Sequence, residues 1–160
     1  MLTIRRCHSG DMSLIRALRL RAREECPDFF ASSYEEEEAR LDSDIIQESI
    51  ENLLYGAWFD DGLIAIAGLH IKGVEGYIYG LYVNPDWRRQ KIASQLLSRV
   101  IEDAPVSVSC FIASIVPRNE EATKLFIELK FSYYVTKKGR LLRANGKKED
   151  LSYFTLKRAM

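Results

Sequence analysis

The stretch spanning residues 76–100, GYIYGLYVNPDWRRQKIASQLLSRV, restricts the fold more than any other part of the chain. In its first part, apolar and aromatic residues alternate at the two-residue period of a strand, at Tyr77, Tyr79, Leu81 and Val83. After Pro85, apolar residues recur at helical spacing, at Ile92, Leu96, Leu97 and Val100. The stretch therefore predicts a strand, a turn and an amphipathic helix whose apolar stripe faces a core.

A basic segment, Arg88-Arg89-Gln90-Lys91-Ile92-Ala93, joins the predicted strand to the predicted helix. The first amides of a helix have no acceptors inside the helix, and the helix dipole favours negative charge at that end. The segment is therefore a candidate phosphate site. The alternative interpretation is a solvated helix start without a ligand.

The rest of the chain alternates between strand-like and helix-like periodicity. Further strands are predicted over residues 2–6, 55–59, 63–72, 106–116, 133–137 and 151–157. Further helical segments are predicted over residues 11–23, from residue 33 onward, over 42–54 and after residue 119. Gly80 marks a bulge or a close backbone approach within its strand, and Asn145-Gly146 suits a hairpin turn.

The predicted topology is an α/β (α+β) domain over residues 1–160. A helix lies between the strands predicted at 76–83 and 106–116, and such a crossover implies that these two strands pair in parallel. The other strands follow one another closely enough for antiparallel pairing. We therefore expect a central mixed, mostly antiparallel sheet of about seven strands, flanked by about four helices.

Size and charge exclude several classes of protein. The 160 residues include 23 Lys and Arg against 23 Asp and Glu, so no net charge attracts nucleic acid or an anionic membrane. The longest apolar stretch, residues 63–71, is too short to cross a membrane, and the first six residues lack the hydrophobic block of a secretion signal. We therefore expect a cytoplasmic protein. Three dispersed cysteines and two histidines indicate neither a disulfide framework nor a metal site.

Two motifs resemble those of the GNAT superfamily of acyl-CoA-dependent N-acetyltransferases. The first comprises residues 81–85, the basic segment 88–93 and Leu96-Leu97, with Lys91 where the family usually has glycine. The second comprises Asn119, Ala122, Phe126 and Lys130-Phe131, with Phe126 where the family has tyrosine and Lys130 where it has glycine. The order of the predicted elements is that of the GNAT fold, and the resemblance covers nearly the whole chain.

The resemblance implies that the protein transfers an acetyl group from acetyl-CoA to a primary amine by direct attack in a ternary complex. It implies cofactor binding by Leu81, Tyr82, Val83, Arg88, Arg89, Gln90, Lys91, Ile92, Ala93, Ser94, Asn119 and Phe126. The implied acceptor is a small molecule or a peptide, without nucleic acid, membrane or metal, and a homodimer is allowed. The alternative is a non-catalytic acyl-CoA-binding or interaction module of the same fold, in which Lys91 and Phe126 record lost catalysis.

The catalytic groups follow less directly from the sequence. An amine with an ordinary lysine-type pKa needs a base or desolvation to attack at pH 7, and Glu75 and Tyr77 stand near the strand position where the family often has an acidic base. Packing aromatics and a solvated turn are the alternative. Phe126 has no proton to give, which leaves water, Tyr133 or Tyr134 to assist the leaving thiolate. Residues 35–38, four glutamates, either begin a helix or attract a cationic amine.

Overall fold

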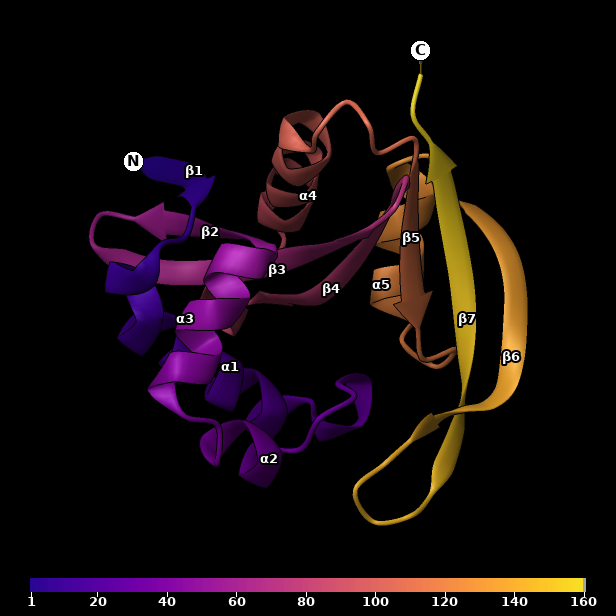
Figure 1. Ribbon diagram of the computed structural model, residues 1–160, viewed down its shortest axis with the longest axis horizontal. Coiled ribbons are helices and arrows are strands. Elements are labelled where there is room, and N and C mark those ends of the chain that lie inside the picture. Colours follow the sequence, from indigo (N-terminus) through magenta and orange to yellow (C-terminus); the bar gives the residue numbers. More distant parts are fainter. Residues whose placement is uncertain (160) are drawn as a thin grey trace.

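The computed structural model describes residues 1–159, and its centre is a seven-stranded mixed sheet with the order β1-β2-β3-β4-β5-β7-β6 (Figure 1). The strands are β1 (Leu2–Arg6), β2 (Leu53–Phe59), β3 (Gly62–Lys72), β4 (Glu75–Val83), β5 (Cys110–Ile115), β6 (Ser132–Leu142) and β7 (Lys148–Lys157). Only the β4–β5 pair is parallel among these described strands, and the other neighbours are antiparallel. The predicted mixed sheet is confirmed, and so is the parallel pairing of the two strands on either side of residues 92–103.

Helices cover both faces of the sheet (Figure 1). They are α1 (Met12–Glu25), α2 (Tyr34–Glu38), α3 (Asp42–Glu51), α4 (Ile92–Asp103) and α5 (Glu120–Glu128), with short 3-10 helices η1 (Ser9–Asp11), η2 (Pro27–Phe29) and η3 (Pro85–Trp87). Five α-helices thus stand where the sequence predicted about four.

Two cores hold these layers together. The predicted stripe of α4, Ile92, Leu96, Leu97 and Val100, is buried against one face of the sheet. On the other face, α1 and α3 bury Ile15, Leu18, Ala22 and Ile45, together with Cys7 after β1. The amphipathic pattern therefore identified the correct buried side of α4. It was only partly right for the other two helices: Leu14 and Ile50 are 40% and 65% exposed, and residues 53 and 54, predicted to continue the helix that begins at residue 42, begin β2.

Several element boundaries differ from the prediction. Residues 106–109 are not part of β5, and Val106 is 95% exposed, because the chain turns after Pro105 with a bond from the Val108 amide to the Pro105 carbonyl. The β-branched residues there were misleading. Strand β6 extends to Leu142, so the long loop expected after residue 137 shrinks to a turn at Gly146, whose φ is 85°.

The far end of α4 is closed by Arg158. Its guanidinium donates to the carbonyl of Ile101 in the last turn at 3.2 Å, to that of the C-cap residue Ala104 at 2.8 Å and to that of Pro105 at 2.6 Å. Because the last carbonyls of a helix have no intrahelical donors and form its negative end, a cation is stabilising there. This contact anchors β7 to the helix whose opposite end carries the basic segment.

Candidate functional site

Strands β4 and β5 pair over only part of their length. Their parallel register runs from Glu75↔Cys110 to Ile78↔Ala113, and β4 then continues to Val83 without β5 as its partner. Figure 1 shows the two strands leaving their shared end in different directions. The later part of β4 therefore presents backbone groups along an edge that β5 does not cover.

A bulge at Gly80 changes the direction of the side chains on β4. Gly80 has a φ of 65°, and the β3–β4 register shifts beside it. Tyr79 and Tyr82 consequently both pack with the α1–α3 core, whereas Leu81 and Val83 pack with the α4 core. The predicted bulge is confirmed. The predicted alternation of side chains is wrong beyond Gly80, because the bulge inserts one residue.

The bulge is open on the side of Gly80. A Cβ atom added at Gly80 would meet no atom within 4 Å, whereas a Cβ at Gly68 on β3 would lie 2.4 Å from the Tyr79 ring. The ring therefore crosses β3 above Gly68 and brings its hydroxyl to 2.6 Å from Glu48 Oε2 on α3. The space beside Gly80 that a side chain would occupy is therefore open to a ligand.

Two left-handed residues shape the loop before α4. Arg89 has a φ of 63° and Lys91, the N-cap residue, has a φ of 58°. The Gln95 amide donates to the Lys91 carbonyl at 3.1 Å, and the amides of residues 92–94 before it have no intrahelical acceptor, as in any α-helix. Lys91 thus adopts the conformation for which glycine is usually required, and the loop presents donors at the positive end of the dipole.

Replacing Lys91 with glycine is expected to raise the melting temperature by about 2–4 °C. A left-handed non-glycine residue costs on the order of 1–3 kcal/mol, and glycine's larger loss of chain entropy cancels about 0.5–1 kcal/mol of this cost. A cost in the middle of the range leaves about 1 kcal/mol, which corresponds to about 2–4 °C for a chain of this size. Thermal unfolding followed by circular dichroism measures the shift. The matched control is Gln90→Gly, which should lower the melting temperature because Gln90 has no positive φ. An unchanged or lower melting temperature in K91G would contradict the strain.

Arg88 is less available for a phosphate than the sequence suggested. Its two terminal nitrogens donate to Glu25 of α1, each at 2.8 Å, and Nε donates to the Val83 carbonyl at 3.0 Å. The hydroxyl of Tyr82 also donates to Glu25. The Arg88 bonds lower the pKa of Glu25, and burial together with Glu25 raises the pKa of Tyr82 to about 12. Arg88 therefore ties the basic loop to α1.

A pocket of about 490 Å³ opens beside the bulge. Tyr79, Gly80 and Tyr82 form its β4 wall, and α1, α2, α3, β3 and the loop after η2 form the rest. The volume lies within the range of small-molecule sites, about 300–1,000 Å³. Of the predicted cofactor-binding and catalytic residues, Tyr82 lines this pocket, and so do Gly80 and two glutamates of the acidic segment, Glu36 and Glu37.

Five charged side chains form an ionic cluster in the pocket wall: Arg19, Arg23, Arg40, Glu37 and Glu48. Arg19 and Arg40 both contact Glu48, and Glu37 lies within 4.0 Å of all three arginines. Burial alone would raise the pKa of Glu48, but bonds and charge from Arg19, with bonds from Tyr79 and Arg40, outweigh it and lower the pKa to about 2. Glu48 is therefore ionised at neutral pH and is a poor proton acceptor.

The four glutamates of residues 35–38 do not form one acidic patch. The side chain of Glu37 is 2% exposed and paired with arginines. Glu36 accepts from the Ser33 amide at 3.0 Å, and its own amide donates to the Ser33 hydroxyl at 3.1 Å, so the predicted capping box is confirmed. Only the outer two glutamates are both exposed and outside these interactions. The interpretation that this segment attracts a cationic amine loses two of its four carboxylates.

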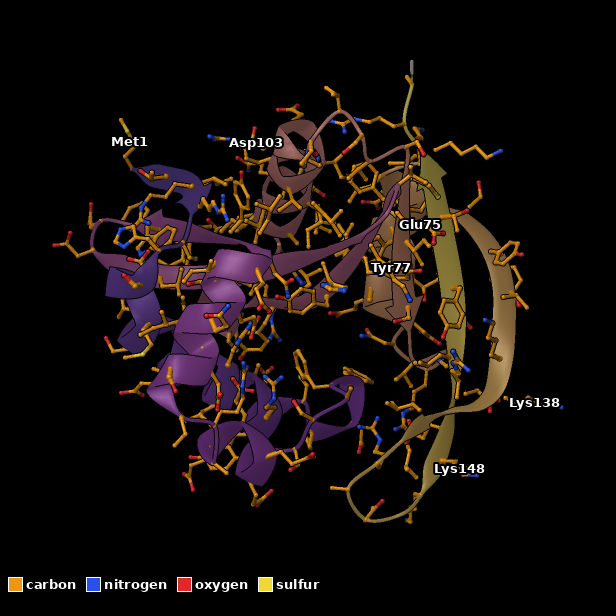
Figure 2. All side chains as sticks on the ribbon, in the orientation of Figure 1. Met1, Glu75, Tyr77, Asp103, Lys138 and Lys148 are labelled. Atoms are coloured by element: carbon orange, nitrogen blue, oxygen red, sulfur yellow. The ribbon has the colours of Figure 1, made fainter. Side chains whose placement is uncertain are left out.

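Glu75 and Tyr77 lie away from the bulge. They sit at the end of β4 that pairs with β5, and the Tyr77 hydroxyl donates to Glu75 at 3.2 Å (Figure 2). Glu75 precedes Gly80 by five residues, which is about 16 Å along a strand. Burial and Glu75 raise the pKa of Tyr77. These two predicted catalytic residues contact each other, but the structure does not bring them to the pocket.

The second sequence motif has a structural role. The Asn119 side chain accepts from the Ala122 amide at 3.2 Å and caps α5, as predicted. Phe126 is 4% exposed and packs edge-on against Phe131 with the ring centroids 5.0 Å apart, so it belongs to the core and does not face the pocket. The candidate acids Tyr133 and Tyr134 lie on β6, the edge strand that β7 separates from β5.

The β6–β7 hairpin contacts the loop that forms one wall of the pocket. Arg143, in the β6–β7 turn, donates to the carbonyl of Phe30 at 2.5 Å and to that of Pro27 at 3.3 Å. It also pairs with Glu149 of β7 at 3.0 Å. Because Phe30 lines the pocket, the hairpin fixes one pocket wall from outside.

Sequence reasoning missed the arginines of α1. Arg16, Arg19 and Arg23 recur at intervals of three and four residues beside the apolar stripe of this helix. That spacing was the available signal, since a charge at the border of a buried stripe needs a partner. Their carboxylate partners are on α2 and α3, and no local pattern reveals which residues these are.

Neither a metal cluster nor a membrane-spanning helix is found among residues 1–159. No group of three or more His, Cys, Asp or Glu side chains in this range is arranged to hold a metal ion. None of the helices within it is both long and apolar enough to cross a membrane.

Comparisons with known proteins agree with this geometry. The family model described as Acetyltransferase (GNAT) family matches residues 19–131, whereas a comparison with curated protein sequences gave no match. An acetyltransferase of the GNAT family from Streptococcus pneumoniae has 14% identity and a TM-score of 0.83, with 99% of this chain and 100% of that chain covered. A putative acetyltransferase from Salmonella typhimurium, solved with acetyl-CoA, has 15% identity and a TM-score of 0.80, with 100% and 95% covered. The ribosomal-protein-S18-alanine N-acetyltransferase from Escherichia coli has 18% identity and a TM-score of 0.76, with 100% and 96% covered.

Proposed function

The chain belongs to the GNAT family of acetyltransferases, and we propose that it moves an acetyl group from acetyl-CoA to a primary amine by direct attack in a ternary complex. The observation that carries this proposal is the position of the Gly80 bulge. It lies at the uncovered edge of β4 and in the wall of a pocket of about 490 Å³. A donor along the strand edge and an acceptor in the pocket would therefore meet at the same peptide groups.

The basic loop fits the phosphates of the donor. Its left-handed residues Arg89 and Lys91 are exposed, and the amides of residues 92–94 begin a helix of 12 residues. Arg88 contributes by holding the loop against α1 through Glu25. We assign phosphate binding chiefly to the backbone of this loop, and the side chains of Arg89 and Lys91 add positive charge.

The residues around the bulge provide the environment for acyl transfer. Acetyl-CoA supplies an activated thioester. The amine nitrogen bonds to the acetyl carbon, the carbon–sulfur bond breaks, and the thiolate takes up a proton. An amide near Leu81 would polarise the acetyl carbonyl, an interaction of the oxyanion-hole type. Because Glu48 has a pKa of about 2 and is held by arginines, we assign no side chain of the cluster as the base and propose that water carries the proton from the amine.

Thiol release from acetyl-CoA over a panel of amines tests the function. The panel contains polyamines, amino acids, aminoglycosides and peptides with free N-termini. The peptides are included because the Escherichia coli neighbour is named for an alanine of a ribosomal protein. We expect turnover with one class, at a rate that rises with pH and then levels off, since Phe126 provides no acid whose loss would slow the reaction. Binding of CoA without turnover on any amine would favour the non-catalytic alternative. A steep alkaline fall in the folded protein would reveal an essential acid.

The location of the reaction is part of the same proposal. The three cysteines are free thiols, which is typical of a reducing compartment. We therefore propose that the enzyme acts in the cytoplasm.

A further inference from the structure

The ionic cluster of the pocket carries more positive than negative charge. It has three arginines and two glutamates, and all five side chains are at least partly shielded from water. A third carboxylate, Glu36, lies at the pocket rim, but it is exposed and its side chain accepts from the Ser33 amide. Water screens Glu36 far more than the buried groups, so the buried cluster has an excess of one positive charge.

Arg23 has the weakest compensation in the cluster. Its nearest recorded carboxylate oxygen is that of Glu37 at 3.9 Å, whereas Arg40 has a Glu48 oxygen at 2.9 Å. The hydrogen bonds of Arg23 end on neutral oxygens: the Ser32 hydroxyl at 3.1 and 2.9 Å and the Arg19 carbonyl at 3.1 Å. These bonds use three of the five N–H donors of a guanidinium.

The surroundings of Arg23 are unfavourable for a lone cation. Its side chain is only 11% exposed, and burial lowers its pKa despite the attraction of Glu37. The ring of Phe30 lies 5.0 Å from the guanidinium carbon, and such a contact compensates a buried charge only in part. An anion in the pocket would pair with Arg23, and the planar fork of arginine matches a carboxylate with two parallel bonds.

We infer that the acceptor is a free amino acid or a close analogue, whose carboxylate pairs with Arg23 while its amine faces the Gly80 bulge. This inference rests on the proposed function, because it places the amine where acyl transfer would occur. Arg23 and Gly80 line the same pocket of about 490 Å³, so one small molecule can reach both. Ala22, Phe30 and Ile66 supply apolar surface for a side chain between them.

The test compares each amino acid with its own carboxamide. Thiol release from acetyl-CoA is measured with L-alanine, L-leucine, L-methionine and L-phenylalanine and with the four amides. We expect at least one acid to exceed its amide at least 10-fold in kcat/KM. The amine of an amide is the less basic of the two, so near neutral pH a larger fraction of it is in the neutral, reactive form. The protonation state of the amine therefore favours the amide and does not produce a preference for the acid.

A pair of variants assigns the preference to Arg23. Arg23→Gln should raise KM for the preferred acid at least 10-fold with a smaller change in kcat, and should leave the kinetics of the amide nearly unchanged. Arg21→Gln is the matched control, because Arg21 is exposed on the same helix and does not line the pocket. It should retain the preference. If Arg23→Gln does not fold, the comparison of acids with amides on the unchanged protein still decides.

The outcomes separate this inference from the proposed function. Turnover of amides, polyamines or peptides at rates equal to or above those of the acids would overturn the carboxylate inference and leave the acetyltransferase proposal standing. If a folded Arg23→Gln variant kept the preference for the acid, Arg23 would not be the residue that pairs with the carboxylate of the acceptor. Absence of thiol release with every amine would overturn the proposed function and the inference together.

Discussion

Replacing Glu37 with glutamine is expected to lower the free energy of unfolding by about 3–5 kcal/mol. The side chain of Glu37 is 2% exposed and lies 3.5 Å from Arg19, 3.5 Å from Arg40 and 3.9 Å from Arg23. Glutamine keeps the shape but leaves three guanidinium groups with Glu48 as their one remaining carboxylate in the cluster. For a chain of this size the melting temperature should fall by about 6–20 °C.

The matched control for this prediction is Glu38→Gln. Glu38 is exposed at the end of the same helix, so its neutralisation should change the free energy of unfolding by no more than about 0.5 kcal/mol. Urea unfolding of the two variants gives the comparison directly. Equal stabilities would mean that the buried carboxylate is not what holds the arginines together.

Replacing Ala93 with glutamate is expected to weaken CoA binding more than 100-fold while leaving the fold intact. A carboxylate in the first turn of α4 would face the phosphates, and two like charges placed opposite each other cost several kcal/mol of binding free energy. A loss of about 2.8 kcal/mol already corresponds to a 100-fold weaker affinity. The same carboxylate interacts favourably with the helix dipole, by about 0.3–1 kcal/mol. Binding and stability should therefore move independently, which calorimetry with CoA and thermal unfolding would reveal.

Gln95→Glu provides the control for Ala93→Glu. It adds a negative charge to the same helix, but two residues later and therefore about 200° around the helix axis. Gln95 is exposed, so the helix should tolerate this change as well. We expect the affinity for CoA to fall by less than 10-fold. Similar losses in both variants would indicate a general charge effect, and no loss in Ala93→Glu would place the phosphates elsewhere.

Most of the fold could be predicted because the spacing of apolar residues along the sequence agrees with the faces that the helices and strands bury. The stripe of α4 was visible at helical spacing, and Gly80 stood alone in a run of aromatic residues. The side chains of β4 beyond Gly80 are an exception. A bulge shifts every later side chain to the opposite face of the strand, so the sequence predicted the position of the bulge but not the orientation of Leu81 and Val83.

The site was predictable only where its function depends on the backbone. The basic loop was found because a turn followed by a helix start has a sequence pattern. The partners of its side chains were not, since Glu25 is 63 residues from Arg88 in the chain. Glu37 and Glu48 were hidden for the same reason: a buried carboxylate and a solvated one look alike until the helices that surround them are placed.

The three cysteines bear on how the reaction can be followed. Burial of Cys7 in the α1–α3 core raises its pKa to about 12, and burial also raises the pKa values of Cys26 and Cys110. The thiolate is the form that reacts with disulfide and maleimide reagents, so these side chains are slow nucleophiles at neutral pH. The sulfhydryl of released CoA is an ordinary exposed thiol. A colorimetric thiol reagent would therefore report turnover against a low background from the protein itself.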